Sequence, residues 1–101
     1  MFGTVARLRV KPGMEDALRA DFERQKQNTI PGLIGECLYR LDRDPQEIVL
    51  VVLFASREAY VANAQAPHQH EDYLRLLTFL EAEPEWHDGD IIMARGLGLA
   101  G

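Results

Sequence analysis

The sequence predicts an α+β domain in which four antiparallel strands form one sheet and helices cover one of its faces. Three observations lead to this prediction. Stretches rich in β-branched and aromatic residues alternate with stretches whose apolar residues recur every three or four positions. Glycine, proline and aspartate separate these stretches at short intervals. The chain has 101 residues, the length of one domain, and we expect a single domain over residues 1–101.

The first half of the chain is expected to form a strand, a helix and a second strand. Residues 2–10 alternate between apolar and polar positions, which predicts a strand that ends at Lys11-Pro12-Gly13. From about Met14 to Asn28, apolar residues at four-residue spacing predict an amphipathic helix. Pro31-Gly32 then forms a turn into a second strand over residues 33–41.

The third expected strand contains the most hydrophobic run of the chain, residues 48–54 with the sequence IVLVVLF. This run does not alternate, so both faces of the strand are apolar. A central place in the sheet explains one apolar face, which helices of the same chain cover. A large bare apolar face on a monomer usually marks a partner surface. We therefore expect a homodimer that forms through the sheet face opposite the helices.

The second half adds a helix in two pieces and a fourth strand. Ser56 is the expected N-cap of a piece over residues 57–65, and Pro67 opens the next piece. The face expected to cover the sheet comprises His70, Tyr73, Leu74, Leu77 and Leu80, whereas Glu71, Asp72 and Arg75 are expected to point away. A strand is expected over residues 90–95, and a flexible tail from Gly96 to Gly101. The order β-α-β-β-α-β is that of the ferredoxin-like fold, in which the first and third strands are central.

Composition and charge exclude several classes of protein. Hydrophobic residues make up 47% of the chain, which excludes general disorder. The formal net charge of -5 disfavours nucleic acid and anionic membrane as partners. Cys37 is the one cysteine and is expected to be an inert buried thiol in a reducing compartment. We find no secretory signal and no apolar segment long enough to span a bilayer, so we expect a cytoplasmic protein.

Four short segments follow one another in an order that carries a family resemblance: Val10-Lys11-Pro12-Gly13, Ile30-Pro31-Gly32-Leu33, Ser56-Arg57-Glu58-Ala59-Tyr60 and Ala66-Pro67-His68-Gln69-His70. In this succession, which covers nearly the whole chain, the sequence resembles the antibiotic biosynthesis monooxygenase domain. The resemblance implies a dimeric α/β barrel, with two sheets paired and the helices outside. Members of that family include cofactor-free oxygenases of quinols or aromatic polyketides, haem-degrading enzymes and proteins without an assigned activity. The fold therefore does not fix the function.

The sequence departs from the family pattern at positions that bear on cofactors. Phe54 stands where many relatives have tryptophan, and Asn63 where many have histidine. Relatives in the haem-degrading branch carry a characteristic set of one Asn, one Trp and one His. In this sequence Ala6 takes the position of the asparagine, and the tryptophan of the following helix is missing. The spacing of His68 and His70 places them on different sides of a helix and favours no metal site. We expect no haem, flavin or metal as cofactor.

His70 is the candidate catalytic base. A histidine changes its charge near neutral pH and can remove a phenolic proton, after which the substrate itself gives an electron to oxygen. The alternative is a core or capping histidine bonded to a backbone carbonyl. The candidate substrate-binding residues are Phe54, Tyr60, Asn63, His68, Tyr73 and Trp86. Ordinary core packing is the alternative role for the aromatic residues, above all for Phe54, and His68 is expected near solvent or the helix mouth.

Two functions from different classes follow. The first is a cofactor-independent monooxygenase that acts on a small aromatic or quinol-type substrate in an apolar pocket. The second is a non-catalytic homodimer that binds a small metabolite or whose pocket is filled by its own side chains. The two differ in whether a cavity exists and whether His70 lines it.

Overall fold

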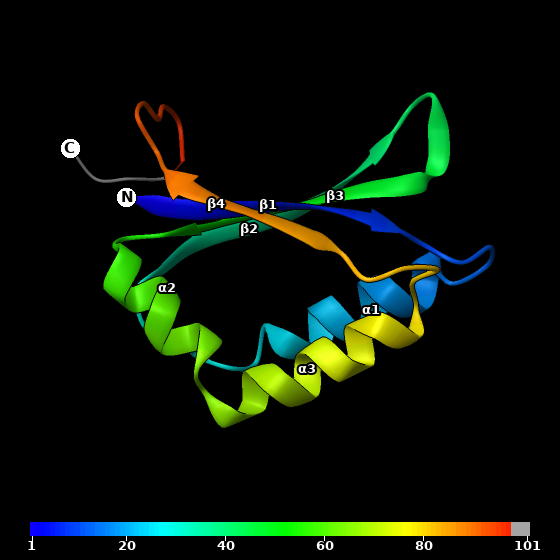
Figure 1. The fold of residues 1–101 in the computed structure, drawn as a ribbon, viewed down its shortest axis with the longest axis horizontal. Coiled ribbons are helices and arrows are strands. Elements are labelled where there is room, and N and C mark those ends of the chain that lie inside the picture. Colours follow the sequence, from blue (N-terminus) through cyan, green and yellow to red (C-terminus); the bar gives the residue numbers. More distant parts are fainter. Residues whose placement is uncertain (98–101) are drawn as a thin grey trace.

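The computed structural model describes residues 1–97, which form one antiparallel sheet with helices on one of its faces (Figure 1). The strands are β1 (Phe2–Arg9), β2 (Leu33–Leu41), β3 (Asp44–Phe54) and β4 (Glu85–Asp90), and the helices are α1 (Glu15–Gln25), α2 (Arg57–Ala64) and α3 (Pro67–Thr78). The strand order is β2-β3-β1-β4. This arrangement confirms the predicted ferredoxin-like α+β fold, with the first and third strands in the centre. Residues 98–101 of the expected flexible tail lie outside the described part of the chain.

The central pair of strands decides which side chains face the helices. β1 and β3 pair antiparallel, with Ala6 opposite Leu50 and Leu8 opposite Ile48. Because successive side chains of a strand point to opposite faces, these four residues lie on one face. They form the core of the domain with Val10, Leu18, Leu76 and Leu80. The apolar side chains of β1 and β3 that point the other way lie on a face without helices (Figure 1).

The fourth strand lies earlier in the chain than the sequence predicts. The prediction of a strand over residues 90–95 is wrong, because β4 spans Glu85–Asp90 and pairs with β1. The segment is polar, with Trp86 as its one large apolar residue, so its composition gives little strand signal. An edge strand needs backbone pairing on only one side, and β1 supplies it. Trp86 lies opposite Ala6 and covers the sheet on the helix side.

The last helix turns a different face to the sheet from the one predicted. Leu74 is 50% exposed, whereas Asp72, expected to face solvent, is 8% exposed. The buried residues of α3 are Asp72 and Leu76. The sequence prediction followed apolar spacing alone, and it missed that an acidic residue can be buried when it is paired with basic side chains.

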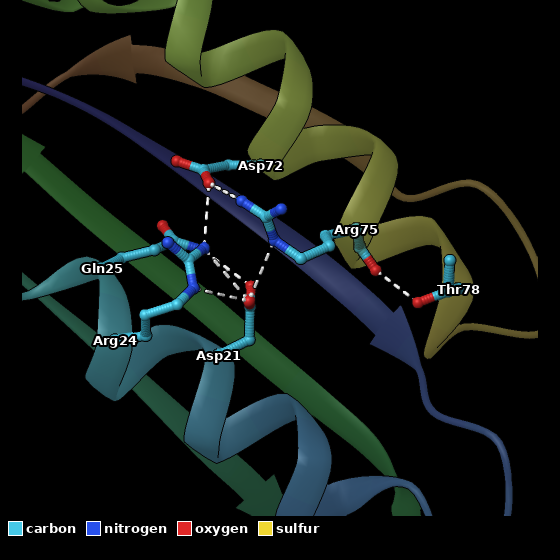
Figure 2. A network of polar contacts seen from close by, with 6 residues as sticks. All are labelled: Asp21, Arg24, Gln25, Asp72, Arg75 and Thr78. Atoms are coloured by element: carbon cyan, nitrogen blue, oxygen red, sulfur yellow. Dashed lines mark hydrogen bonds and ion pairs between the residues drawn. The ribbon is translucent and has the colours of Figure 1, made fainter.

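Those partners come from two helices and are shown in Figure 2. Arg24 of α1 donates to both buried carboxylates, with 3.1 Å from Nη2 to Oδ1 of Asp21 and 3.1 Å to Oδ1 of Asp72. Arg75 of α3 reaches the same two acids, at 3.2 Å from Asp21 Oδ1 and 2.7 Å from Asp72 Oδ1. Gln25 donates to the other oxygen of Asp21 at 2.9 Å. α1 and α3 are therefore joined side by side through four charged groups, which we call the interhelix ion-pair cluster.

The cysteine prediction also needs correction. Cys37 is exposed, not buried, because it lies on the edge strand β2 with its side chain on the bare face, opposite Val51. Within residues 1–97, no helix is long and apolar enough to cross a membrane. The expected location in the cytoplasm stays a prediction.

Replacing Asp72 with alanine should test the interhelix ion-pair cluster. The change leaves Arg24 and Arg75 with only Asp21 as a shared partner, and we expect the free energy of unfolding to fall by about 1–2 kcal/mol. Urea unfolding measures this loss. Glu23→Ala is the matched control, because Glu23 pairs with Lys26 at an exposed position of α1. Its effect should stay within about 0.5 kcal/mol, and equal losses in both variants would contradict a special role for the cluster.

Candidate functional site

Two rows of side chains on the helix side of the sheet lie beneath a cavity, which is lined by Glu36, Val52, Thr4, Leu50 and Trp86 of these rows. The pairing registers place Glu36, Val52, Thr4 and Asp88 in one row that crosses all four strands. The next row is Leu38, Leu50, Ala6 and Trp86. Strands lie about 4.8 Å apart, so each row brings together residues that are far apart in the sequence. The floor is apolar in its centre and carries a carboxyl group near each edge.

The cavity above this floor has a volume of about 310 Å³. This volume lies at the lower end of the range for small-molecule sites in proteins. Its floor includes Thr4, Leu50 and Val52, and the helical walls come from α1, α2 and α3. The wall residues are Phe22, Gln25, Tyr60, Ala64, Gln69, His70, Asp72, Tyr73 and Leu76, with Ile30, Glu36 and Trp86 at the sides.

A second cleft of about 460 Å³ lies between α1 and β2 and shares Phe22, Glu36 and Leu50 with the cavity. Its other walls carry charges of both signs. Arg40 of β2 donates to Glu15 of α1 at 2.6 Å, which ties the far end of the cleft together. Because Glu36 stands on the boundary of both spaces, it is positioned where an elongated ligand would pass from one to the other.

The structure brings four of the predicted site residues to one cavity. His70, Tyr60, Tyr73 and Trp86 all line it, from α3, α2 and β4. The His70 side chain is exposed to solvent, so it stands at the rim of the cavity. Its predicted role as a base is a matter for experiment.

The other three predicted residues lie outside the lining. Phe54 is 1% exposed and packs edge-on against the ring of Tyr60, with 5.6 Å between centroids. His68 is exposed on the first turn of α3. The amide nitrogen of Asn63 donates to Gln69 at 3.4 Å, and its buried Oδ1 has no hydrogen-bond partner in the described structure. Phe54 and Asn63 thus support lining residues from behind.

Tyr60 is held in its protonated form. Burial, and then the hydrogen bond that its hydroxyl donates to Asp88 at 2.9 Å, raise the pKa of Tyr60 to about 12. At neutral pH this side chain is therefore a hydrogen-bond donor and not a base. The Tyr60 hydroxyl keeps its proton and donates it in the hydrogen bond to Asp88. Thr4 is also close to the Tyr60 hydroxyl.

Sequence reasoning missed Glu36 and Thr4, the polar groups of the floor. The Glu36 side chain is exposed, but partial desolvation of its carboxyl group beside the sheet raises its pKa, and the positive charge of Lys26 just after α1 offsets part of this effect. The available signal was a lone carboxylate between Ile34 and Leu38 on one face of the second strand. Thr4 gave no such signal, because threonine is common in strands. Among residues 1–97, no group of three or more His, Cys, Asp and Glu is arranged to hold a metal ion.

The sheet, its three covering helices and the cavity between them define a small α+β domain with a ferredoxin-like fold. The model of the antibiotic biosynthesis monooxygenase family matches residues 1–71. Since the match includes most of the chain, the protein belongs to this family. No curated protein matches the sequence at a significant level.

Solved structures agree with this fold. A putative antibiotic biosynthesis monooxygenase from Chloroflexus aurantiacus is 23% identical, with a TM-score of 0.77, and the match covers 96% of this chain and 98% of that one. Rv0793 from Mycobacterium tuberculosis is 20% identical, with a TM-score of 0.76 and coverage of 94% and 98%. A mutant of SnoaB, a cofactor-independent oxygenase from Streptomyces nogalater, is 15% identical, with a TM-score of 0.79 and coverage of 92% and 94%. At these identities the likeness shows the fold alone.

Glu36→Gln should reveal the partial desolvation of the Glu36 carboxylate as a small change in the pH dependence of stability. A carboxyl whose pKa is raised in the folded state binds more protons there than in the unfolded chain. Its contribution to stability is complete below the unfolded pKa and is lost as the pH rises through the folded pKa. We therefore expect Glu36→Gln to raise the melting temperature at about pH 7.5 and to change it little at about pH 4.

Scanning calorimetry at both pH values measures this difference. Glu71→Gln is the control, because this substitution removes the same charge from an exposed position on α3. The argument would fail if Glu36→Gln lowered the melting temperature at neutral pH, since that result would mean the carboxylate stabilises the fold.

Proposed function

We propose that this protein is a cofactor-independent monooxygenase that acts on a small aromatic or quinol-type substrate. The observation that carries the proposal is the cavity between helices and sheet, with His70 at its rim and the rings of Tyr73 and Trp86 in its walls. Aromatic walls suit a flat aromatic ligand, and the polar side chains around them can fix its orientation. Membership of the monooxygenase family supports the same reaction class.

The proposed chemistry needs a base and an apolar space. With a phenol as substrate, His70 accepts the hydroxyl proton, and the phenolate passes one electron to O₂. Superoxide then combines with the ring radical at the para carbon to form a peroxide. His70 returns its proton to the outer peroxide oxygen, the O–O bond breaks, and water leaves with the hydrogen of that ring carbon. One phenol and one O₂ thus give one quinone and one water.

Tyr60 has a supporting role in this proposal. Because its pKa is raised to about 12, its hydroxyl stays protonated and does not compete with His70 as a base. The Tyr60 ring also packs on Phe2 and Phe54, with centroid distances of 5.1 and 5.6 Å, which fixes the α2 side of the cavity.

His70→Ala tests the role of the base. We expect turnover of α-naphthol, a phenol whose para carbon carries a hydrogen, to fall by about 10²- to 10⁴-fold when followed by oxygen uptake in the absence of flavin and added metal. The melting temperature should change little, because the side chain is exposed and makes no hydrogen bond with other described residues. Glu71→Ala, an exposed neighbour on the same helix, is the control. Full activity of the His70 variant would remove His70 from the mechanism.

A non-catalytic dimer that binds a small metabolite is the second candidate. The observation that favours it is that His70 has no orienting hydrogen-bond partner among residues 1–97, whereas a catalytic base is usually held by a third group. Ligand binding without oxygen uptake across a panel of quinols would support this candidate over the enzyme.

We also propose that the protein forms a homodimer through the bare face of the sheet. A row on this face brings Val51 and Val5 together with Cys37. Val5 is 40% exposed and Tyr39 is 49% exposed on the same face, and Ile92 and Met93 after β4 are exposed as well. Burying such side chains on a partner removes apolar area from water, at roughly 25 cal/mol per Å².

Val51→Asp should break this dimer. The change places a charge in the middle of the proposed contact, where burial without a partner is unfavourable. Sedimentation equilibrium at micromolar concentration should give twice the chain mass of 11.4 kDa for the unchanged protein and the single mass for the variant. Val61→Asp, at an exposed position on α2, introduces the same group on the helix side and should leave the dimer intact. A monomeric unchanged protein would refute the proposal.

A further inference from the structure

The floor of the cavity carries two polar groups that have no partner in the described structure. They are the Glu36 carboxyl on β2 and the Thr4 hydroxyl on β1, and both belong to the row that crosses the sheet through Val52. The Glu36 side chain is open to solvent, whereas the Thr4 hydroxyl is removed from water. Because buried polar groups are normally hydrogen-bonded, the unpaired Thr4 hydroxyl calls for an explanation.

Glu36 differs from the other acids that line the cavity and the adjoining cleft. Asp72 is held by Arg24 and Arg75, and Glu15 and Glu23 are paired with Arg40 and Lys26. Glu36 forms no hydrogen bond or ion pair with any residue among 1–97. Its neighbours across the strand are Val52 and, one row further, Leu38 and Leu50. The Glu36 side chain is exposed to solvent, so what it offers a ligand is an unpaired carboxyl group beside the cavity.

Thr4 provides an independent observation. Its side chain is 3% exposed, and the buried Oγ1 has no hydrogen-bond partner in the described structure. Its polar neighbour is the Tyr60 hydroxyl, which donates to Asp88 and whose oxygen lies near Thr4 Oγ1 without full hydrogen-bond geometry. Valine has nearly the same shape and a higher strand preference, so packing alone does not require a hydroxyl at this position.

We propose that Glu36 and Thr4 bind hydroxyl groups of the substrate from the floor of the cavity, opposite His70 on α3. The ligand class is then a flat aromatic molecule with hydroxyl groups on two edges, one facing the sheet and one facing His70. This inference rests on the proposed function in placing the substrate in this cavity.

The chemistry of the two groups fits such a ligand. A carboxylate accepts a hydrogen bond from a hydroxyl, and charge-assisted bonds of this kind are stronger than neutral ones. A threonine hydroxyl can both accept and donate. Glu36 and Thr4 are two strands apart, roughly 10 Å between backbones, and their side chains stand on the same face. A fused-ring system can therefore contact both, with its centre on Val52.

The test measures binding of two probes without oxygen. The chain has one tryptophan, Trp86, which lines the cavity, so quenching of its fluorescence reports occupancy. Under argon, naphthoquinol with two hydroxyl groups should bind about tenfold to a hundredfold more tightly than α-naphthol with one. In Glu36→Leu the ratio of the dissociation constants of α-naphthol and naphthoquinol should fall to nearly one. In Thr4→Val it should fall by about threefold to tenfold, because the lost hydrogen bond is neutral.

Controls separate binding from folding. Glu71→Gln removes a charge from the exposed side of α3 and should keep the ratio of the unchanged protein. The melting temperature of Thr4→Val should be equal to or above that of the unchanged protein, because this change removes a buried unpaired hydroxyl. The melting temperature of Glu36→Leu should change little, because Glu36 is exposed. The inference is overturned if neither probe quenches Trp86, or if both variants keep the ratio of the unchanged protein.

Oxygen uptake with α-naphthol, whose para carbon carries the hydrogen that the proposed reaction removes, distinguishes this inference from the proposed function. A ratio that depends on Glu36 without enzymatic oxygen uptake would support the floor contacts and refute the monooxygenase. Oxygen uptake that depends on His70, combined with an unchanged ratio in both floor variants, would support the monooxygenase and refute the floor contacts.

Discussion

The register of β1 against β3 is the constraint on which the cavity depends. Pairing Thr4 with Val52 and Ala6 with Leu50 places small and medium-sized residues under the helices, where they leave room. A shift by one residue would turn every side chain of a strand to the opposite face. Val5 and Val51 would then face the helices, and the polar groups of the floor would face away. The apolar core around Leu8 and the position of the floor groups are therefore set by the same ladder of backbone hydrogen bonds.

The helix layer leaves space because charge, as well as apolar packing, holds it together. α1 buries Leu18 and Asp21, and α3 buries Leu76 and Asp72, so each helix contributes one apolar and one acidic buried residue. The two acids meet Arg24 and Arg75 between the helices (Figure 2). A helix fixed to its neighbour by a side-on cluster does not need to fill the space beneath it. Partly buried pairs are also screened by salt less than exposed ones, so this layer tolerates changes in ionic strength.

Much of the fold was predictable from local pattern, because β2 and the opening of α3 at Pro67 are marked by alternation, turn residues and helix-start chemistry. The failures share one cause, which is that a partner elsewhere in the chain decided the outcome. β4 is a strand because β1 pairs with it, and Asp72 is buried because Arg24 comes from another helix. The same limit applied to the site. Helical spacing was enough to predict that His70 and Tyr73 face the space between helix and sheet. The row that joins Glu36 to Thr4 could not be predicted in this way, because it depends on the register of three strands.

The two unpaired polar groups on the floor bear on the choice between a ligand site and a purely structural cavity. A cavity that serves only packing is most stable when its lining is apolar, because each buried polar group without a partner weakens the fold. Thr4 does not follow this rule, although valine would fit the strand at this position. Departures from local consistency concentrate at functional sites, where stability is given up for binding or chemistry. The floor therefore favours a site that binds hydroxyl groups of a ligand. Catalysis would in addition require a base, and His70 is the candidate for this role.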